Sequence, residues 1–368
     1  MLTKGDDYPI HQMPEPIAYA GTDRNFYDRY FFNGYSRNDN HFFAICLGVY
    51  PHLNIIDASF CVIEDGIQHN IHASRLLHME RMDTRVGPIS IEVIEPLKEL
   101  AVSLDENEYG ISADLTFKSR SKAIEEPRFT HRVGPRTYYD YTRMTQNGTY
   151  SGWIHVRDRS IKLSNDRFLG TRDRSWGIRP VGAPDSQPAE PSPARQFYWL
   201  WAPLNFDNCC TFYHINTDAD GRPWNQGGCY VPVANAEPVE AASSKSSIVL
   251  KSGTRHAQSA VIDMSLHDCK EIQIFLEPQF NFYMIGLGYR NPEWGHGLFK
   301  GEHITGYDSF DLKTLKESDL SYLHVQAFCK ARMKQGNSRE QVGAGVLEQL
   351  ILGPHKPSGF KNLLDLAP

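Results

Sequence analysis

The stretch Thr137–Val156, which reads TYYDYTRMTQNGTYSGWIHV, is the part of the chain that points most directly to its fold. Aromatic and β-branched residues, which favour strands, lie on both sides of the pair Asn147-Gly148. An Asn-Gly pair supplies the positive φ angles that a tight type I′ turn requires. We therefore predict two antiparallel strands, Thr137–Thr145 and Tyr150–Val156, joined by a hairpin.

Short stretches of the same kind recur along the whole chain. Ile55–Glu64 and Ile67–Ala73 flank Asp65-Gly66 and predict a second hairpin. Long amphipathic helices are scarce, and only Ser74–Asp83 and Leu312–Leu320 have room for one or two helical turns. Further strands are expected over 41–50, 89–94, 101–104, 111–117, 196–202, 209–215, 228–233, 247–251, 259–266, 271–275, 282–288, 298–300, 302–310, 322–327 and 342–352. Many short strands at this spacing are typical of β-sandwiches and β-barrels.

The length of 368 residues predicts two domains. Gly182–Arg195 contains four prolines and few large apolar groups, which is the composition of a linker. We therefore expect an N-terminal β-domain over 1–181, a linker over 182–195 and a C-terminal β-domain over 196–368. The predicted class is all-β, with two antiparallel barrels or sandwiches in tandem, each large enough to bury its own core.

Composition excludes several classes of protein. The net charge of −6 offers no basic excess for phosphates, so we expect no nucleic-acid partner. No run of 18 apolar residues is present, so we expect no membrane span, and the first residues lack the apolar core of a signal peptide. The seven cysteines are odd in number and contain no C-x-x-C pair, which is typical of reduced thiols in a cytoplasmic protein.

The segment Gly170–Pro180, which reads GTRDRSWGIRP, combines charge with an aromatic group between two glycines and is expected to form a turn. Asp173 lies between Arg172 and Arg174, so their positive charges are expected to lower its pKa and to hold its geometry. Trp176 adds a large flat apolar surface. The segment is expected either to line a site or to form an arginine–aspartate clamp between domains without any chemistry.

A second turn with functional residues is expected over Asn291–Glu302, which reads NPEWGHGLFKGE. Its three glycines allow close approach of the backbone. Trp294 offers an apolar wall, His296 a group that titrates near neutral pH, and Glu302 a carboxylate. The alternative is that His296 is only bonded to a backbone carbonyl inside a turn.

Aromatic residues are numerous, with 19 Phe, 18 Tyr and 6 Trp. Some of them are expected to line a cavity for an apolar ligand, with core packing as the alternative; these candidates are Tyr139, Tyr141, Tyr198, Trp201, Tyr213 and His214. We expect no metal site, because His69 and His72 would point to different faces of a strand and no third ligand accompanies them. Nucleotide-binding and nucleophile-elbow motifs are missing, so no cofactor is expected.

The two motif segments, Gly170–Gly177 and Pro292–Gly297, resemble those of a bacterial group of proteins. In layout this group is similar to carotenoid 1,2-hydratase (hydroxyneurosporene synthase)-like proteins. The resemblance implies two lipocalin-like β-barrel domains in tandem and acid–base chemistry on apolar terpenoid or polyketide-like substrates without a cofactor. It also implies an acidic residue with nearby histidine, tryptophan and tyrosine in the site, for which Asp173 and Trp176 are the nearest candidates by position.

We expect a cofactor-independent lyase of the hydratase or dehydratase type, or an isomerase. Its substrate would be a small apolar molecule of the terpenoid, steroid-like or aromatic kind, in a pocket between the two β-domains. His296 or Glu302 would supply the proton, because two arginines would keep Asp173 ionised and leave it to orient the site.

Trp176 and Trp294 would form the walls of this pocket, with Arg172 and Arg174 beside them. Two alternatives stay open. In the first, the protein is a non-catalytic carrier of an apolar ligand. In the second, the two motifs only hold the domain interface together. The oligomeric state also stays open, a homodimer included.

Overall fold

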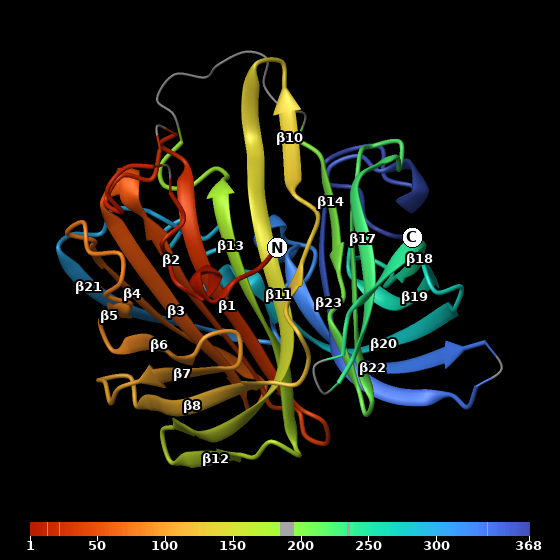
Figure 1. Ribbon diagram of the computed structural model, residues 1–368, viewed down its shortest axis with the longest axis horizontal. Helices are drawn as coiled ribbons and strands as arrows, with labels where there is room; N and C mark the ends of the chain where they lie inside the picture. Colours follow the sequence, from red (N-terminus) through yellow and green to blue (C-terminus); the bar gives the residue numbers. More distant parts are fainter. Residues whose placement is uncertain (13, 22, 185–194, 234–235, 337) are drawn as a thin grey trace. The chain divides into compact units, whose positions relative to one another are not determined.

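The computed structural model describes residues 1–368 except 13, 22, 185–194, 234–235 and 337, and it confirms the all-β class (Figure 1). The described residues form one sheet of fourteen strands and one of nine. Five short 3-10 turns accompany them: η1 (Lys4–Asp7), η2 (Pro51–Leu53), η3 (Met284–Leu287), η4 (Leu320–Tyr322) and η5 (Lys356–Ser358). No helix in this described part of the chain is long and apolar enough to cross a membrane.

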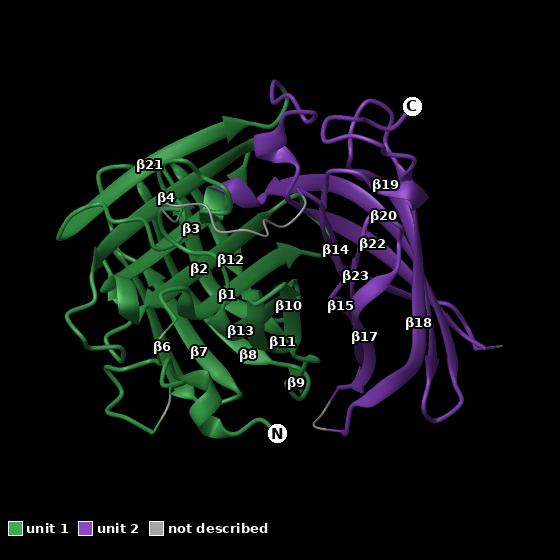
Figure 2. Cartoon of the chain, turned by 90° about the horizontal axis from the view of Figure 1, so that it is seen from above, with its two compact units in different colours: residues 1–192, 286–313 green, residues 193–285, 314–368 purple. Residues whose placement is uncertain are grey.

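The chain divides into two compact units (Figure 2). Unit 1 comprises Met1–Ser192 and Gly286–Lys313, and unit 2 comprises Pro193–Ile285 and Thr314–Pro368. Unit 1 thus includes a stretch of the chain that we expected in the C-terminal domain. The cause is strand β21 (His303–Asp311), which pairs along its length with a strand of unit 1 near the N-terminus. Of the predicted linker, residues 185–194 lie outside the described residues.

The sheet of unit 1 runs from β21 at one edge to β5 at the other, in the order β21-β4-β3-β2-β1-β13-β11-β8-β7-β6-β5. In Figure 1 the blue β21 lies beside the orange β4. The short strands β9, β10 and β12 pair with β11. The strands are β1 (Phe26–Ser36), β2 (Phe42–Tyr50), β3 (Ile55–Glu64), β4 (Ile67–Leu76), β5 (Arg85–Val86), β6 (Ile89–Glu95), β7 (Glu99–Leu104), β8 (Ile111–Ser119), β9 (Ile124–Glu125), β10 (Phe129–Val133), β11 (Arg136–Val156), β12 (Arg159–Leu163) and β13 (Phe168–Ile178).

Unit 2 is a closed antiparallel barrel. Closure arises because β16 pairs with β17 while β14 pairs with both β16 and β23. Its strands are β14 (Phe197–Trp201), β15 (Leu204–Phe206), β16 (Cys209–Thr217), β17 (Pro223–Pro232), β18 (Val239–Leu250), β19 (Ala257–Leu266), β20 (Glu271–Tyr283), β22 (Val325–Gln335) and β23 (Gln341–Leu352). The expectation of two tandem antiparallel β-domains of the lipocalin-like kind is therefore confirmed.

The central strands of unit 1 are buried on both faces, but the two faces differ in chemistry. One face carries the apolar core, for example Phe32, Ile45 and Phe60. The opposite face carries polar groups such as Arg29 and His72, both less than a tenth exposed. Side chains alternate between the two faces of each strand, and directly paired residues of neighbouring strands lie on the same face. The polar groups therefore form one continuous face, and the candidate site lies on it.

The predicted hairpin at Gln146–Gly148 is wrong, since β11 runs straight through it. Asn147 and Gly148 pair with Thr171 and Gly170 of β13. The Thr171 hydroxyl donates to Asn147 Oδ1 at 2.7 Å, and a Cβ atom at Gly148 would lie 2.3 Å from the Phe117 ring. Asn147 and Gly148 favour a turn by residue type, but their contacts with neighbouring strands place them inside the sheet.

The hairpin predicted at Asp65-Gly66 is confirmed, because φ is positive at both residues and β3 pairs with β4 on either side. Neither helical stretch forms. Ser74 to Leu76 end β4, and the only helical turn near Leu312–Leu320 begins at its last residue.

Candidate functional site

The segment with the two arginines forms most of strand β13 and not the expected turn. It pairs with β1 on one side and β11 on the other. Since side chains alternate along a strand, Arg172 and Arg174 point to the core face and Asp173 to the polar face. The expectation that these arginines pair with Asp173 is therefore wrong.

Both arginines bind carboxylates from near the N-terminus instead. Arg172 contacts Asp7 through Nη1 and Nη2, and Arg174 Nη2 donates to Asp28 Oδ1 at 2.7 Å. All four side chains are buried. These two ion pairs attach residues near the N-terminus to strand β13 in the middle of the sheet.

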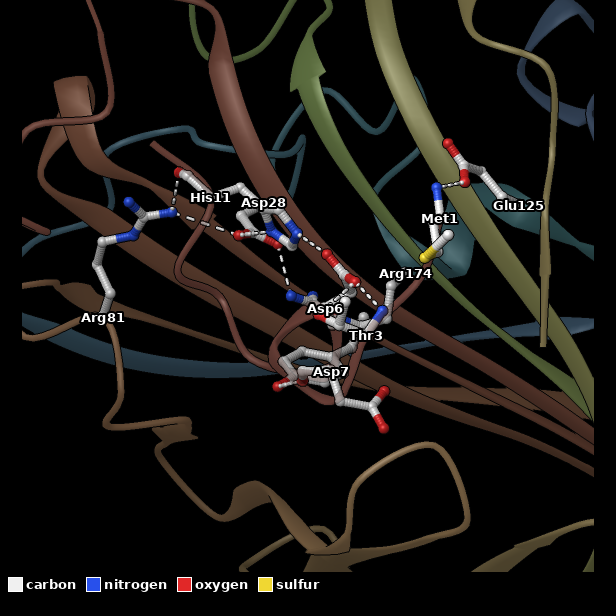
Figure 3. A network of polar contacts seen from close by, with 10 residues as sticks. Met1, Thr3, Asp6, Asp7, His11, Asp28, Arg81, Glu125 and Arg174 are labelled. Carbon is white, nitrogen blue, oxygen red and sulfur yellow. Dashed lines mark hydrogen bonds and ion pairs between the residues drawn. The ribbon is translucent and has the colours of Figure 1, made fainter. Parts of the chain in front are cut away.

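Asp28 is the centre of a buried network (Figure 3). Its Oδ2 also accepts from Arg81 Nη2 at 3.3 Å and lies 3.0 Å from Nδ1 of His11. Burial alone would raise the pKa of Asp28, but the charges of Arg174, His11 and Arg81 outweigh burial and lower it. The other nitrogen of His11 lies 3.1 Å from Asp6 Oδ1, so the ring lies between two carboxylates.

The ring of His11 stacks on Trp176, with centroids 3.7 Å apart and planes at 7°. This pair forms a wall of a cleft of about 670 Å3 in unit 1, which we call the Trp176 cleft. Its lining combines apolar and polar groups: Ile10, Ala20, Phe26, Tyr141 and Ile178 with Asp6, Asp23, Arg128, Asp140 and Thr142. Its volume is within the range usual for sites that bind small organic molecules.

The second motif lies on the polar face of unit 1, on the stretch between η3 and β21. Trp294 stacks on His72 of β4, with centroids 5.0 Å apart and planes at 7°. A Cβ atom at Gly306 would lie 2.2 Å from Trp294 Cζ2, so that glycine makes room for the indole. Nδ1 of His72 lies 3.0 Å from the Ser59 hydroxyl, which fixes its ring.

Both ring nitrogens of His296 are engaged. Nδ1 lies 2.9 Å from Arg179 Nη2, and because arginine can only donate, Nδ1 must accept. Nε2 then carries the proton and donates to the Leu287 carbonyl at 2.7 Å. This geometry holds His296 as a neutral ring and leaves it poorly placed to give a proton to a substrate.

The carboxyl group best placed for proton transfer is Asp57 of β3. Its Oδ2 accepts from the Gly297 backbone N–H at 2.6 Å, and its Oδ1 accepts from the Tyr50 hydroxyl at 3.1 Å. Burial raises the pKa of Asp57 to about 7 against these hydrogen bonds and the nearby charges of Arg29 and Arg179. A carboxyl with this pKa exchanges protons at neutral pH.

Asp57 and His296 line one cavity of about 10 Å3, which we call the Asp57 cavity. Cys46, Ser59, Trp294 and Lys300 also line it. This volume is about the space of one water molecule.

The other predicted residues of unit 1 lie apart from the Asp57 cavity. Glu302 is exposed and contributes its backbone carbonyl to Leu76. Tyr141 lines the Trp176 cleft and stacks on Phe129, and Tyr139 packs edge-on against Tyr141. Trp176 and His296 therefore border two different cavities of unit 1.

Four predicted residues belong to unit 2. Tyr198 and Tyr213 are part of its apolar core, while Trp201 and His214 lie on the opposite face of the same strands. A polar cluster on that face is centred on Glu348, which accepts from Trp199, His324 and Gln326. Burial raises the pKa of Glu348, but these partners lower it to about 2, so the group is a fixed anion.

Sequence reasoning missed Asp28, Asp57, His11 and Arg29. A usable indication was present in Ile55–Glu64, where polar residues alternate with large apolar ones inside a strand with no obvious exposed face. Among the described residues, no group of three or more His, Cys, Asp or Glu is placed to hold a metal ion. The seven cysteines are free thiols.

Comparison with known proteins identifies a family and a fold. The model of a family described as "Family of unknown function (DUF8625)" matches residues 2–361. The crystal structure of a Nitrosomonas europaea protein provisionally named AttH is similar, with a TM-score of 0.51 and 11% identity over 93% of this chain and 98% of that one. At this identity the similarity shows a shared fold. No curated protein matches the chain. Neither description names a carotenoid hydratase, so that part of the resemblance stays a prediction.

Proposed function

Because the chain belongs to the DUF8625 family, whose function is unknown, we propose a function from the site itself: unit 1 binds a small neutral molecule with a flat apolar body. The observation that carries this proposal is the Trp176 cleft of about 670 Å3. Its indole wall is held flat by the stack on His11, and His11 is held in turn by Asp6 and Asp28. An aromatic wall that is already rigid loses little entropy when a ligand binds to it.

Replacing Trp176 by alanine is expected to weaken binding of the neutral dye N-phenyl-1-naphthylamine at least tenfold, about 1.4 kcal/mol. The loss follows from the apolar contact area that the indole supplies. Dye fluorescence measures the affinity. The matched control is Trp153→Ala, because Trp153 packs on His155 and does not line the cleft. Equal affinity in the Trp176 variant and the wild type would contradict the proposal.

A second candidate function, a cofactor-independent lyase of the hydratase type or an isomerase, is favoured by a different observation. Cys46 of β2, Asp57 of β3 and Trp294 come from separate parts of the chain and converge on one cavity with room for a water molecule. With both nitrogens of His296 engaged, Asp57 is the better acid. His296 is then a positioning residue, which holds Arg179 beside the cavity.

In this scheme the π electrons of an alkene take the proton of the Asp57 carboxyl and form a C–H bond. The oxygen of the bound water forms a C–O bond at the cationic carbon and returns a proton to the Asp57 carboxylate. The aromatic ring of Trp294 stabilises the cation once the Lys300 ammonium, which lies 4.8 Å from the ring centroid, has left it. Because the cavity itself holds about one water, the alkene needs the Lys300 side chain, which lines the cavity, to move aside.

Incubation with a panel of neutral terpenoid alkenes and alcohols in D2O tests this second function, with deuterium at carbon read by mass spectrometry. Asp57→Asn is expected to lower exchange at least about 100-fold, the usual contribution of a general acid. Asp114→Asn is the control, since Asp114 is exposed on β8. Exchange that survives in the Asp57 variant would remove Asp57 from the reaction, and no exchange in the wild type would leave only the binding function.

A further inference from the structure

Arg29 of β1 is a buried arginine with unused donors. The residue is 4% exposed, and its Nε and Nη1 have no hydrogen-bond acceptor among the residues that the structure describes. By contrast, the buried Arg172, Arg174 and Arg143 each bind a carboxylate directly. A buried guanidinium is normally paired, because the cost of removing the charge from water is otherwise not offset.

A second guanidinium lies close to the first. Both guanidinium groups lie near the ring of Tyr289. The Arg29 guanidinium is 5.0 Å and the Arg179 guanidinium 5.5 Å from the ring centroid. The Arg29 charge is near enough to act against the ionised form of Arg179. Within the described part of the chain, Arg179 contacts a ring nitrogen of His296 and no carboxylate.

The nearby carboxylates do not satisfy the unused donors of Arg29. The charge of Asp173 acts on Arg29, but Nε and Nη1 of Arg29 have no acceptor among the described residues. The oxygens of Asp57 already accept from Gly297 and Tyr50. A carboxylate from a ligand would offer these donors an acceptor of opposite charge.

We propose that Arg29 and Arg179 form a binding site for the carboxylate of a small organic acid on the polar face of unit 1. The planar carboxylate matches the fork of a guanidinium, which donates two parallel hydrogen bonds to it. Tyr289 lies between Gly288, with φ 96°, and Arg290, with φ 57°, so the backbone on both sides of the ring is in the left-handed region. The Tyr289 ring lies within 5.5 Å of both guanidinium groups, and in this proposal the acid takes the place of the ring when the ring moves away.

This site is separate from the Trp176 cleft, because Arg29, Arg179 and Tyr289 do not line that cleft. The inference goes beyond the proposed ligand of the cleft, and neither depends on the other. The inference is tested by binding and needs no catalytic activity, so its outcome is independent of the lyase scheme.

Calorimetric titration of the full chain with benzoate tests the inference, with the neutral isostere benzamide and with inorganic phosphate as comparison probes. Benzoate is expected to bind at least tenfold more tightly than either. Arg29→Met is expected to weaken benzoate binding at least tenfold, while dye binding in the Trp176 cleft stays unchanged. The matched control is Arg85→Met, whose side chain is 55% exposed on β5.

Arg29→Lys covers the case in which the methionine variant does not fold, because it keeps the charge and loses the fork. It is expected to weaken benzoate binding at least threefold. Three results would overturn the inference: unchanged benzoate affinity in a folded Arg29 variant, benzamide binding as tight as benzoate, or phosphate binding tighter than benzoate.

Discussion

Asp28→Asn is expected to lower the free energy of unfolding by about 3–5 kcal/mol, the usual effect of removing one partner from a buried ion pair. Asp28 is fully buried and binds Arg174, Arg81 and His11 at once. Asparagine fills the same space but carries no charge. Two buried guanidinium groups would then lose their counter-ion without any change in packing volume.

Urea unfolding at pH 7 measures this effect. The matched control is Asp105→Asn, because Asp105 pairs with Arg85 in an exposed bridge in which both side chains are about half accessible to water. That variant is expected to change stability by less than about 1 kcal/mol. A loss of similar size in both variants would show that the Asp28 network contributes no more than a surface pair.

Asp57→Asn is expected to change how stability depends on pH. The folded protein raises the pKa of Asp57 from 3.8 to about 7, so between these values the folded state holds a proton that the unfolded state has released. The free energy of unfolding of the wild type therefore falls as pH rises from about 4 to about 7, by roughly 1.4 kcal/mol per pH unit from this group. Asparagine does not ionise and removes this contribution.

At pH 8 the Asp57→Asn variant is therefore expected to be more stable than the wild type, by on the order of 4 kcal/mol. At pH 4 the two are expected to be equally stable. Urea unfolding at a series of pH values measures the difference, with Asp114→Asn as the exposed control. Parallel curves for the wild type and the Asp57 variant would show that the carboxyl ionises as freely in the folded state as in water.

Local patterns were sufficient for much of the strand content. The pair Asp65-Gly66 forms the tight turn that its residue types predict, and the strand expected over 196–202 forms at Phe197–Trp201. Asn147-Gly148 has the same kind of preference but lies inside a strand. The difference is that Asn147 finds a buried hydrogen-bond partner in Thr171 of a neighbouring strand, and no local pattern contains that information.

The sequence indicated two residues that border the cavities, Trp176 and His296, but neither Asp57 and His11 nor the contacts among these residues. The unusual composition around Trp176 and His296 marked both as candidates, and each borders a cavity. Their partners were missed because they lie far away in the chain: Arg174 binds a residue 146 positions before it, and the Gly297 N–H binds one 240 positions before it. The order of strands in the sheet brings these residues together.

Side chains alternate between the two faces of any strand, so the pattern of residues along the chain was sufficient to predict an all-β protein. The unusual residue types of the two motifs were also visible in the sequence. Only the folded sheet decided which face of each strand lies against the core. It also decided that Gly286–Lys313 belongs to unit 1. The physical reason is that strand pairing is selected by the burial of whole faces across the sheet. Asp57 is held beside His296, and Arg29 beside Arg179, by that burial and not by any preference of the residues themselves.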